Sequence, residues 1–248
     1  MKYKNILIEK YNDYVIHIIF NRKNKYNALN SELTDELIDV LKKSDQSELI
    51  KCIVISGSEN FCVGADINEL ASNPDFIRSW EFIDTVRKPI IAAVGGMAFG
   101  GGNELLLMCD IILASREAEF AQPEICLGLI CGGGGTQRLP KKIGKGMAME
   151  MCLTGSSITA KEAKDIGLIN HVYDTGELIK NALQLADSIS LKPMEAIIST
   201  KKLIKDSCSN QSDGLIAEKN EFMRLLKGDN GIEGINAFLE RRKPQFKN

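Results

Sequence analysis

The sequence predicts an α/β fold, and three observations support this prediction. Strand-like and helix-like patterns alternate through the first half of the chain. Residues 52–56 and 89–94 form short, continuous apolar runs, as expected of strands that are covered on both faces. From Thr136 onward the pattern becomes helical. Together these features indicate a body built around a sheet and followed by helices.

The chain begins with two strand-like segments and a helix. Residues 6–9 and 15–20 are rich in branched side chains, and the turn-prone residues 11–13 separate them, which indicates paired strands. Asn30 or Ser31 is suited to cap the helix that follows. Apolar residues at helical spacing give this helix one face directed at a core: Leu33, Leu37, Val40 and Leu41.

The second half of the chain contains further helix signals. Residues 145–153 and 193–205 show clear helical patterns. The run from Thr159 to Glu162 has the capping-box form, in which each side chain accepts a hydrogen bond from the other residue's backbone N–H. A helix is therefore expected to begin at this point.

The charge balance argues against a nucleic-acid partner. The chain has 31 Lys and Arg residues against 33 Asp and Glu residues, so its net charge is −2 and no global positive field exists. The longest apolar stretches, such as residues 90–97, are too short to cross a bilayer, and no signal-type apolar block follows the N-terminus. We therefore expect a cytoplasmic protein.

The cysteines and histidines give little support for a metal centre. The seven cysteines contain no Cys-x-x-Cys pair and mostly lie in apolar runs, which indicates buried, reduced thiols. Only two histidines are present, and neither has paired Cys/His spacing. We expect no metal site.

Glycines cluster in the middle of the chain. Ten of the 21 glycines fall between Gly95 and Gly135. Tight turns explain single glycines, but glycine also lets a ligand approach the backbone closely. Neither a P-loop nor a Rossmann glycine pattern is present, so the cluster does not indicate a nucleotide-phosphate site.

Glu104 stands where a glycine run enters an apolar helix. Gly100 to Gly102 precede it, and Leu105 to Met108 follow. Backbone N–H groups at such a helix start are unpaired and can bind an oxyanion. A buried carboxylate is costly unless it is held or used, so Glu104 is either a catalytic group or a helix-start charge satisfied by those N–H groups.

Glu124 is a second carboxylate in apolar surroundings, 20 residues further along. Two such groups are expected to have pKa values shifted by their environment, as acid/base chemistry requires. A carboxylate pair equally suits glycoside hydrolysis, and the spacing alone does not establish that the two groups face one another.

Five segments occur in a fixed order along the chain. They are Phe61-Cys-Val-Gly-Ala-Asp-Ile67, Pro89-Ile-Ile-Ala-Ala-Val94, Ala98-Phe-Gly-Gly-Gly-Asn-Glu104, Phe120-Ala-Gln-Pro-Glu124 and Gly134-Gly-Thr-Gln-Arg-Leu139. This ordered set resembles the crotonase, or enoyl-CoA hydratase, superfamily. The resemblance continues to the terminal run Ala237 to Lys243 and therefore covers nearly the whole chain.

The resemblance implies a fold and an assembly. The fold would be a crotonase-type spiral of β-β-α units in residues 1–190, which holds the CoA and catalytic site. A helical C-terminal trimerisation segment, residues 191–248, would follow and form a homotrimer or a homohexamer built as a dimer of trimers.

The resemblance also implies an activity. A relative of this kind adds water reversibly, in syn geometry, to a 2-trans-enoyl-CoA and gives a 3-hydroxyacyl-CoA. Glu104 and Glu124 would hold the water as the catalytic pair, and the Gly132 N–H would help to position it. The backbone N–H groups of Ala65 and Gly101 would form the oxyanion hole. No cofactor is implied beyond the coenzyme A of the substrate.

Further positions would bind the acyl-CoA. The CoA would lie along Ala28 and along Ala65, Asp66, Ile67 and Asn68, with further contacts from Phe238 and Arg241. Arg22 and Lys25 are close enough in sequence to meet its phosphates, and the alternative for each is a solvated surface charge. Phe238 and Arg241 would reach the site of a neighbouring subunit. Residues 71–86 would form part of the acyl pocket and contain the rings of Phe76, Trp80 and Phe82. Two of these rings pointing inward would restrict the pocket to short chains, and Trp80 is suited either to the core or to the pocket wall.

Three departures from the family pattern, and three other functions, remain open. Asn68 stands where Lys is frequent, Asn103 where Cys is frequent, and Cys131 where Pro is frequent. The alternatives are a CoA-dependent enoyl isomerase, a specialised acyl-CoA dehydratase, and a noncatalytic scaffold that binds acyl-CoA or RNA. Retention of both glutamates favours hydration.

Overall fold

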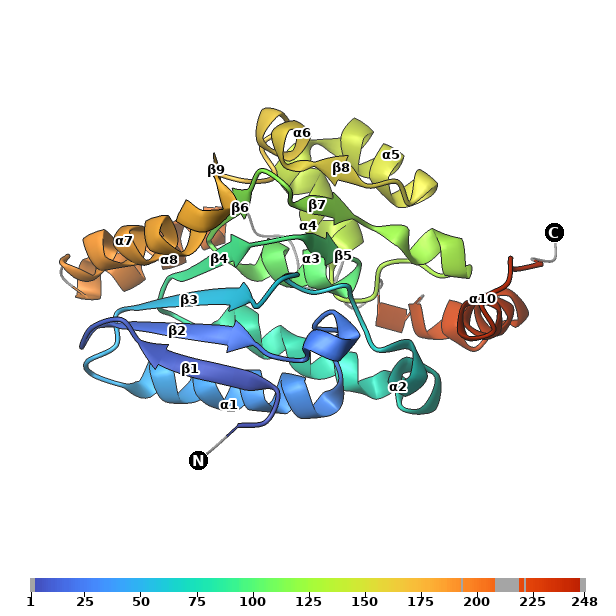
Figure 1. Cartoon of the computed structure of the whole chain (residues 1–248), viewed down its shortest axis with the longest axis horizontal. Coiled ribbons are helices and arrows are strands. Elements are labelled where there is room, and N and C mark those ends of the chain that lie inside the picture. The colour runs from blue at the N-terminus through green and yellow to red at the C-terminus, as the bar shows by residue number, and fades with distance from the viewer. Residues whose placement is uncertain (1–2, 193, 208–218, 221, 246–248) are drawn as a thin grey trace.

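The structure is a computed structural model that describes residues 3–192, 194–207, 219–220 and 222–245. A six-stranded sheet runs through the body of the molecule (Figure 1). β1 pairs with β2 in antiparallel fashion, and every other neighbouring pair in this sheet is parallel. In spatial order the strands are β1 (Ile6–Lys10), β2 (Val15–Phe20), β3 (Cys52–Gly57), β4 (Ile90–Val94), β6 (Ile111–Ser115) and β9 (His171–Tyr173).

A second, smaller sheet contains β5 (Met97–Phe99), β7 (Glu119–Ala121) and β8 (Ile158–Thr159). The chain visits the large sheet and then the small one, as β4 then β5 and β6 then β7, before each helical segment. This repeat is the expected spiral of β-β-α units. The α/β fold class is thereby confirmed.

Helices cover both faces of the large sheet. Along β3, Ile53 and Ile55 pack into the core that contains the buried face of α1, whereas Cys52 and Val54 face α7. The helical elements of the body are η1 (Lys23–Lys25), α1 (Ser31–Gln46), α2 (Ile67–Ser72), η2 (Pro74–Thr85), α3 (Gly101–Met108), η3 (Pro123–Leu127), α4 (Gly135–Ile143), α5 (Lys145–Thr154), α6 (Ala160–Asp165), η4 (Thr175–Glu177) and α7 (Leu178–Ser190).

Two predicted helix starts are confirmed. The Asn30 side chain accepts a hydrogen bond from the Leu33 N–H at 3.1 Å, so Asn30 rather than Ser31 caps α1. Thr159 and Glu162 form the complete capping box at the start of α6. Each cap satisfies backbone N–H groups that have no partner within the helix.

The C-terminal segment contributes α8 (Met194–Ser207) and α10 (Asp229–Leu239). The expected helix at 193–205 is α8, and Pro193 itself lies outside the described residues. Figure 1 shows α10 in red beside α2, at the end of the molecule far from α7. Gly234 permits a close approach of α10 to η3, since a Cβ there would lie 1.9 Å from the Leu127 carbonyl oxygen. The division of the chain at residue 190 stays a prediction.

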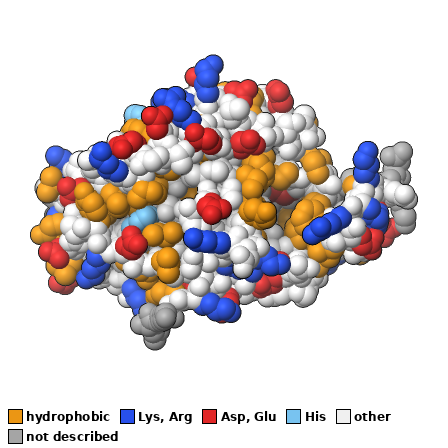
Figure 2. All heavy atoms as spheres, viewed as in Figure 1, with side chains coloured by type: hydrophobic (Ala, Val, Ile, Leu, Met, Phe, Trp, Pro, Cys, Tyr) orange, Lys and Arg blue, Asp and Glu red, His pale blue; other side chains and the backbone are white. Residues whose placement is uncertain are grey.

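The surface carries both signs of charge. Lys, Arg, Asp and Glu side chains are interspersed on the face shown in Figure 2. Six cysteines are free thiols, four of them buried, and Cys208 lies outside the described residues. Within the described part of the chain, no helix combines the length and apolar character needed to span a membrane.

Candidate active site

Glu104 lies in the first turn of α3 and is only 2% exposed. Its Oε1 atom accepts hydrogen bonds from the Gly133 and Gly135 N–H groups, both at 2.8 Å. Gly135 is the first residue of α4, so the carboxylate sits at the positive end of that helix. The charge is satisfied by N–H groups, but these come from α4 and the loop before it, not from the helix in which Glu104 stands.

Gly102 lets the start of α3 pack directly on the backbone near Cys62. A Cβ at Gly102 would lie 2.1 Å from the Cys62 carbonyl oxygen and 2.8 Å from its carbon. Backbone atoms cannot move aside as a flexible side chain can. The glycine run therefore fixes the position of the turn that carries Glu104.

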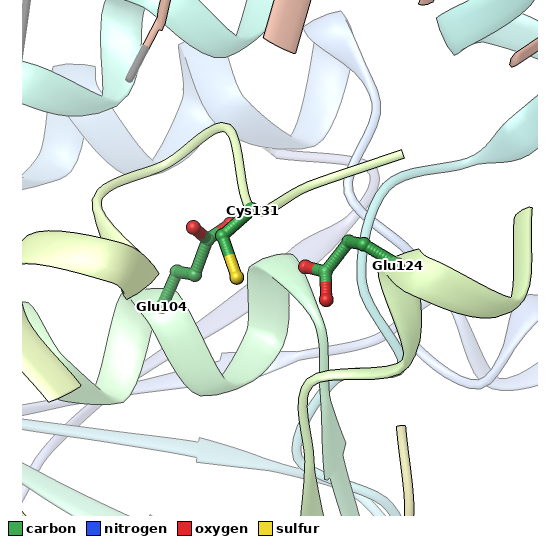
Figure 3. A group of neighbouring side chains, drawn as sticks. All are labelled: Glu104, Glu124 and Cys131. Carbon is green, nitrogen blue, oxygen red and sulfur yellow. The ribbon is translucent and has the colours of Figure 1, made fainter. Parts of the chain in front are cut away.

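Glu124 reaches the same place from η3. Its Oε1 atom lies 3.2 Å from where a Cβ of Gly100 would stand, so the carboxylate rests against the glycine turn before α3. Carboxylate oxygens of Glu104 and Glu124 and the thiol of Cys131 all lie within 4.8 Å of one another. The structure thus brings the two predicted catalytic side chains together from separate elements, as Figure 3 shows.

The Cys131 thiol points into the space between the two carboxylates (Figure 3). It is 3% exposed. A hydrogen bond with Cys152, burial and the nearby charges of Glu124 and Glu104 raise the pKa of Cys131 well above its usual value. Cys131 therefore stays a neutral thiol at neutral pH. In the sequence, Cys131 was notable only because Pro is frequent at this position in the family.

A cavity of about 90 Å³ lies beside the two carboxylates. Both glutamates line it, together with the backbone at Ala65, Gly101 and Gly132. Its apolar walls come from distant parts of the chain: Ile67, Leu70, Ile77, Trp80, Leu127, Leu129 and Phe222. Such a volume holds a few water molecules or a short acyl group.

Trp80 closes one side of this cavity. It is 4% exposed, and its ring lies 2.6 to 2.9 Å from where Cβ atoms of Gly101 and Gly133 would stand. Phe76 packs edge-on against Trp80, with ring centroids 6.1 Å apart. Phe82 instead packs beneath Lys42, whose Nζ lies 5.0 Å from the ring centroid. Of the three rings in the segment expected to form the acyl pocket, only Trp80 lines the cavity.

The backbone N–H groups of Ala65 and Gly101 lie close together. The Ala65 nitrogen is 3.5 Å from where a Cβ of Gly101 would stand, and both residues line the cavity. Neither N–H donates to a backbone carbonyl within the described part of the chain. Among the described residues, both N–H groups thus lack a backbone partner at the cavity, and their role as an oxyanion hole stays a prediction. Gly132 faces the Phe222 ring, whose nearest carbon lies 2.6 Å from where a Cβ of Gly132 would stand.

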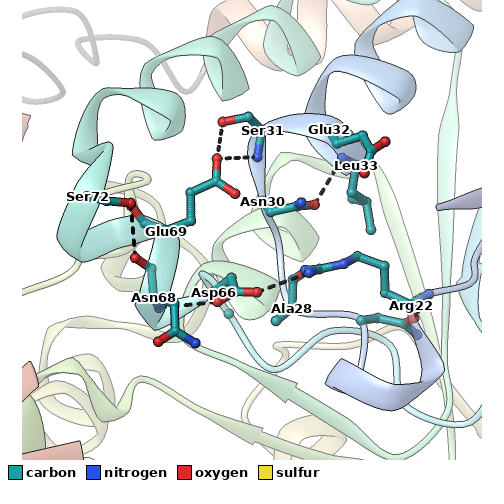
Figure 4. Close-up of polar contacts among 12 residues, drawn as sticks. Arg22, Ala28, Asn30, Ser31, Glu32, Leu33, Asp66, Asn68, Glu69 and Ser72 are labelled. Atoms are coloured by element: carbon teal, nitrogen blue, oxygen red, sulfur yellow. Dashed lines mark hydrogen bonds and ion pairs between the residues drawn. The ribbon is translucent and has the colours of Figure 1, made fainter. Parts of the chain in front are cut away.

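The segment expected to contact CoA is held together by its own polar contacts (Figure 4). Arg22 forms an ion pair with Asp66 at 3.0 Å and donates a second hydrogen bond to the Ala28 carbonyl. Asp66 also caps α2 by accepting from the Asn68 N–H at 3.2 Å. Lys25 and Asn68 are exposed. Arg22 thus orders this segment, and its contact with a phosphate stays a prediction.

Phe238 and Arg241 lie at the exposed end of α10 and just beyond it. Phe238 is 56% exposed, and neither residue lines the catalytic cavity of its own chain. Their expected contact with a neighbouring subunit stays a prediction.

Several cavity residues carried no functional signal in the sequence. Leu127, Leu129 and Phe222 look like ordinary core residues, and Phe222 lies 98 residues after Glu124 and 118 after Glu104. Trp80 was left open between core and pocket wall, and it serves as both. The tertiary packing around the cavity identifies these walls.

Comparison with known proteins gives consistent matches along the chain. Residues 10–248 match the family model described as enoyl-CoA hydratase/isomerase. A probable enoyl-CoA hydratase of Mycobacterium leprae is 40% identical over 255 residues, covering 99% of both chains. The mitochondrial enoyl-CoA hydratase of Pongo abelii is 39% identical over 239 residues, covering 93% of this chain and 82% of that protein. The crystal structure of an enoyl-CoA hydratase from Mycobacterium avium subsp. paratuberculosis superimposes with a TM-score of 0.90 at 28% identity over 100% of both chains.

Proposed function

The chain belongs to the enoyl-CoA hydratase/isomerase family, and from this premise we propose that Glu104 and Glu124 are the acid/base pair of its reaction. The activity is that of an enoyl-CoA hydratase, an enzyme of the hydro-lyase type. The observation that carries the residue assignment is the convergence of two carboxylates from α3 and η3 on one small cavity. Glycoside hydrolysis, which the carboxylate pair alone would also suit, is excluded because the chain belongs to the enoyl-CoA hydratase/isomerase family.

The thioester carbonyl of the substrate would lie between the N–H groups of Ala65 and Gly101. Water attack at C3 moves negative charge onto that oxygen and forms an enolate. Two preorganised donors in a cavity with apolar walls stabilise this charge, and losing one such hydrogen bond typically costs about 3 kcal/mol. This role is supported by the close approach of the Ala65 nitrogen to Gly101, 3.5 Å from where a Gly101 Cβ would stand, and by the position of both residues on the cavity wall.

The water would lie between Glu104 and Glu124, with help from the Gly132 N–H. One carboxylate accepts a proton from the water as its oxygen bonds to C3, and the other supplies a proton to C2. Because one pair of groups handles both transfers, oxygen and hydrogen reach the face of the double bond that is turned toward the pair. Syn addition follows. The proposed reaction requires no metal and no cofactor beyond the coenzyme A of the substrate.

A direct assay tests this assignment against the alternatives. Hydration of crotonyl-CoA removes the absorbance of the conjugated thioester and yields 3-hydroxybutyryl-CoA, whereas an isomerase moves the double bond without adding water. Product analysis on the purified protein distinguishes the two. A noncatalytic scaffold would leave the substrate unchanged, and RNA binding driven by phosphates would weaken steeply with salt. The cytoplasmic location stays a prediction.

Short acyl chains are expected to be the best substrates, because Trp80, Ile77 and Phe222 close a cavity of only about 90 Å³. Each methylene that finds no apolar contact forgoes about 0.8 kcal/mol of binding. We expect kcat/KM to fall from four-carbon to eight- and twelve-carbon enoyl-CoAs. Ile77→Ala should lessen this fall by enlarging the cavity. A kcat/KM that is flat or rises with chain length contradicts the expectation.

We also propose assembly as a homotrimer or a dimer of trimers. In the single chain, Leu203 and Ile204 of α8 are 67% and 62% exposed. Contiguous exposed apolar side chains of this kind mark interaction surfaces. The double substitution Leu203→Asp with Ile204→Asp should lower the sedimentation coefficient, whereas Lys10→Asp on the exposed edge strand should not. Sedimentation of the wild-type protein as a monomer refutes the assembly.

Arg241 is proposed to bind the CoA 3′-phosphate of a neighbouring subunit. It is exposed and stands just after α10, where it makes no contact with the catalytic cavity of its own chain. Arg241→Ala should raise KM for crotonyl-CoA several-fold with little change in kcat, since the contact binds substrate and transition state equally. The exposed Lys227→Ala serves as the control. An unchanged KM for the Arg241 variant would contradict the proposed contact with the CoA 3′-phosphate.

A further inference from the structure

We propose that Cys131, Glu104 and Glu124 form a binding site for a thiophilic divalent cation such as Zn²⁺. The bound ion would inhibit the enzyme by occupying the space between the two carboxylates. Metal binding itself depends only on the arrangement of these three side chains. The inhibition rests in addition on the proposed roles of the two glutamates.

The three ligand atoms are already close to a metal-binding arrangement. One oxygen from α3, one oxygen from η3 and the sulfur from the loop before α4 all lie within 4.8 Å of one another (Figure 3). Tetrahedral Zn²⁺, with bonds of about 2.0–2.3 Å, requires ligand atoms about 3.5 Å apart. A separation at the 4.8 Å limit would have to shorten by about 1.3 Å. A side-chain rotation of the half-buried Glu124 can supply this movement.

The surroundings favour an ion at this position over a solvated surface ion. Glu104 and Cys131 are 2% and 3% exposed, so little water competes for their ligand atoms. The Gly133 and Gly135 N–H groups hold one oxygen of Glu104, as outer partners orient metal ligands in other sites. Zn²⁺ binding would displace the proton of the Cys131 thiol into solvent. The resulting thiolate and the two carboxylates form a mixed sulfur and oxygen set that suits Zn²⁺.

A buried amide beside the thiol gives independent support. Gln122 is 1% exposed, and neither polar atom of its side chain has a hydrogen-bond partner among the described residues. Its Nε2 and the Cys131 Sγ lie 2.7 and 2.8 Å from where a Cβ of Gly135 would stand, so amide and thiol are neighbours. A buried amide of this kind normally has a partner. A water on the fourth coordination position of the ion would provide one.

A second cavity provides a path to the site. It measures about 270 Å³ and is lined by Gln122, Glu124, Cys131 and Cys152, with apolar walls from Ile130 and Met149 among others. It shares Glu124 with the catalytic cavity. An ion entering this way reaches the thiol without passing the substrate.

The test uses Co²⁺ as a spectroscopic substitute for Zn²⁺ on the full-length protein. Coordination by a thiolate gives an ultraviolet charge-transfer band that carboxylates alone do not give. We expect one Co²⁺ per chain with this band, its loss in Cys131→Ser, and at least about tenfold weaker binding in Glu124→Gln. Cys126→Ser, which removes an exposed thiol outside the group, should keep the band. Cys152→Ser should also keep it.

The activity measurement separates the two parts of the proposal. Zn²⁺ should inhibit crotonyl-CoA hydration and a chelator should restore it, whereas Cys131→Ser should be at least about tenfold less sensitive relative to its own metal-free rate. A band that persists in Cys131→Ser, or that disappears in Cys126→Ser or Cys152→Ser instead, overturns the site. A protein that binds Co²⁺ as expected but hydrates nothing would overturn the proposed function and leave the metal site standing.

Discussion

Replacing Glu104 or Glu124 by glutamine is expected to lower kcat by at least about a hundredfold, because a positioned acid or base usually contributes about 10² to 10⁴ in rate. Glutamine keeps the size of the side chain but cannot exchange a proton with water or with C2. At position 104, the carbonyl oxygen of the glutamine side chain can still accept hydrogen bonds from the Gly133 and Gly135 N–H groups. Steady-state hydration of crotonyl-CoA measures the loss.

Binding should survive in both variants, since neither change removes a CoA contact. Calorimetric titration with a non-hydratable acyl-CoA should give a Kd within a few-fold of the wild type. Glu150→Gln, on the exposed face of α5, provides a control that should keep full activity. A variant at position 104 or 124 that turns over at a near-normal rate would exclude that residue from the proton transfers.

Gly102→Ala is expected to cause the largest loss of stability among single-methyl additions at the site. The new Cβ would stand 2.1 Å from the Cys62 carbonyl oxygen, so α3 must move away from the backbone beneath it. Overpacking of this kind costs about 3 kcal/mol. The melting temperature should fall by about 6–12 °C for a chain of this size, as measured by calorimetry. Activity should fall as well, because the same turn carries Glu104.

Gly146→Ala is the matched control for this change. A Cβ at Gly146 meets nothing within 4 Å, and the residue is exposed in α5. Alanine should leave stability unchanged or raise it by up to about 1 kcal/mol through its greater helix propensity. Equal melting temperatures for the two variants would show that the close packing of Gly102 on the Cys62 backbone does not contribute to stability.

The elements that carry the site follow from local sequence patterns. The entry of Gly100 to Gly102 into a buried helix places Glu104 in its first turn, as the structure has it. The cap at Asn30 and the capping box at Thr159 depend on residues three positions apart, and both form as predicted. Short-range rules suffice where the interaction itself is short-range.

The contacts that complete the site depend on packing between distant segments. The carboxylate of Glu104 is held by N–H groups 29 and 31 residues further along, and no spacing in the sequence indicates them. Phe222 lines the cavity because the C-terminal part of the chain brings its ring against Gly132, 90 residues earlier in the sequence. The family resemblance placed Arg22 near CoA phosphates, but nothing in its local pattern revealed the ion pair with Asp66.

The most direct test of the central claim is hydration of crotonyl-CoA in water enriched in heavy oxygen, followed by mass spectrometry of the thioester product. The proposed chemistry of Glu104 and Glu124 predicts 3-hydroxybutyryl-CoA with one heavy oxygen at C3, formed by the wild-type protein and nearly absent with either glutamine variant. A product of unchanged mass with a shifted double bond would contradict hydration, and full labelling by a glutamine variant would contradict the assignment of that residue.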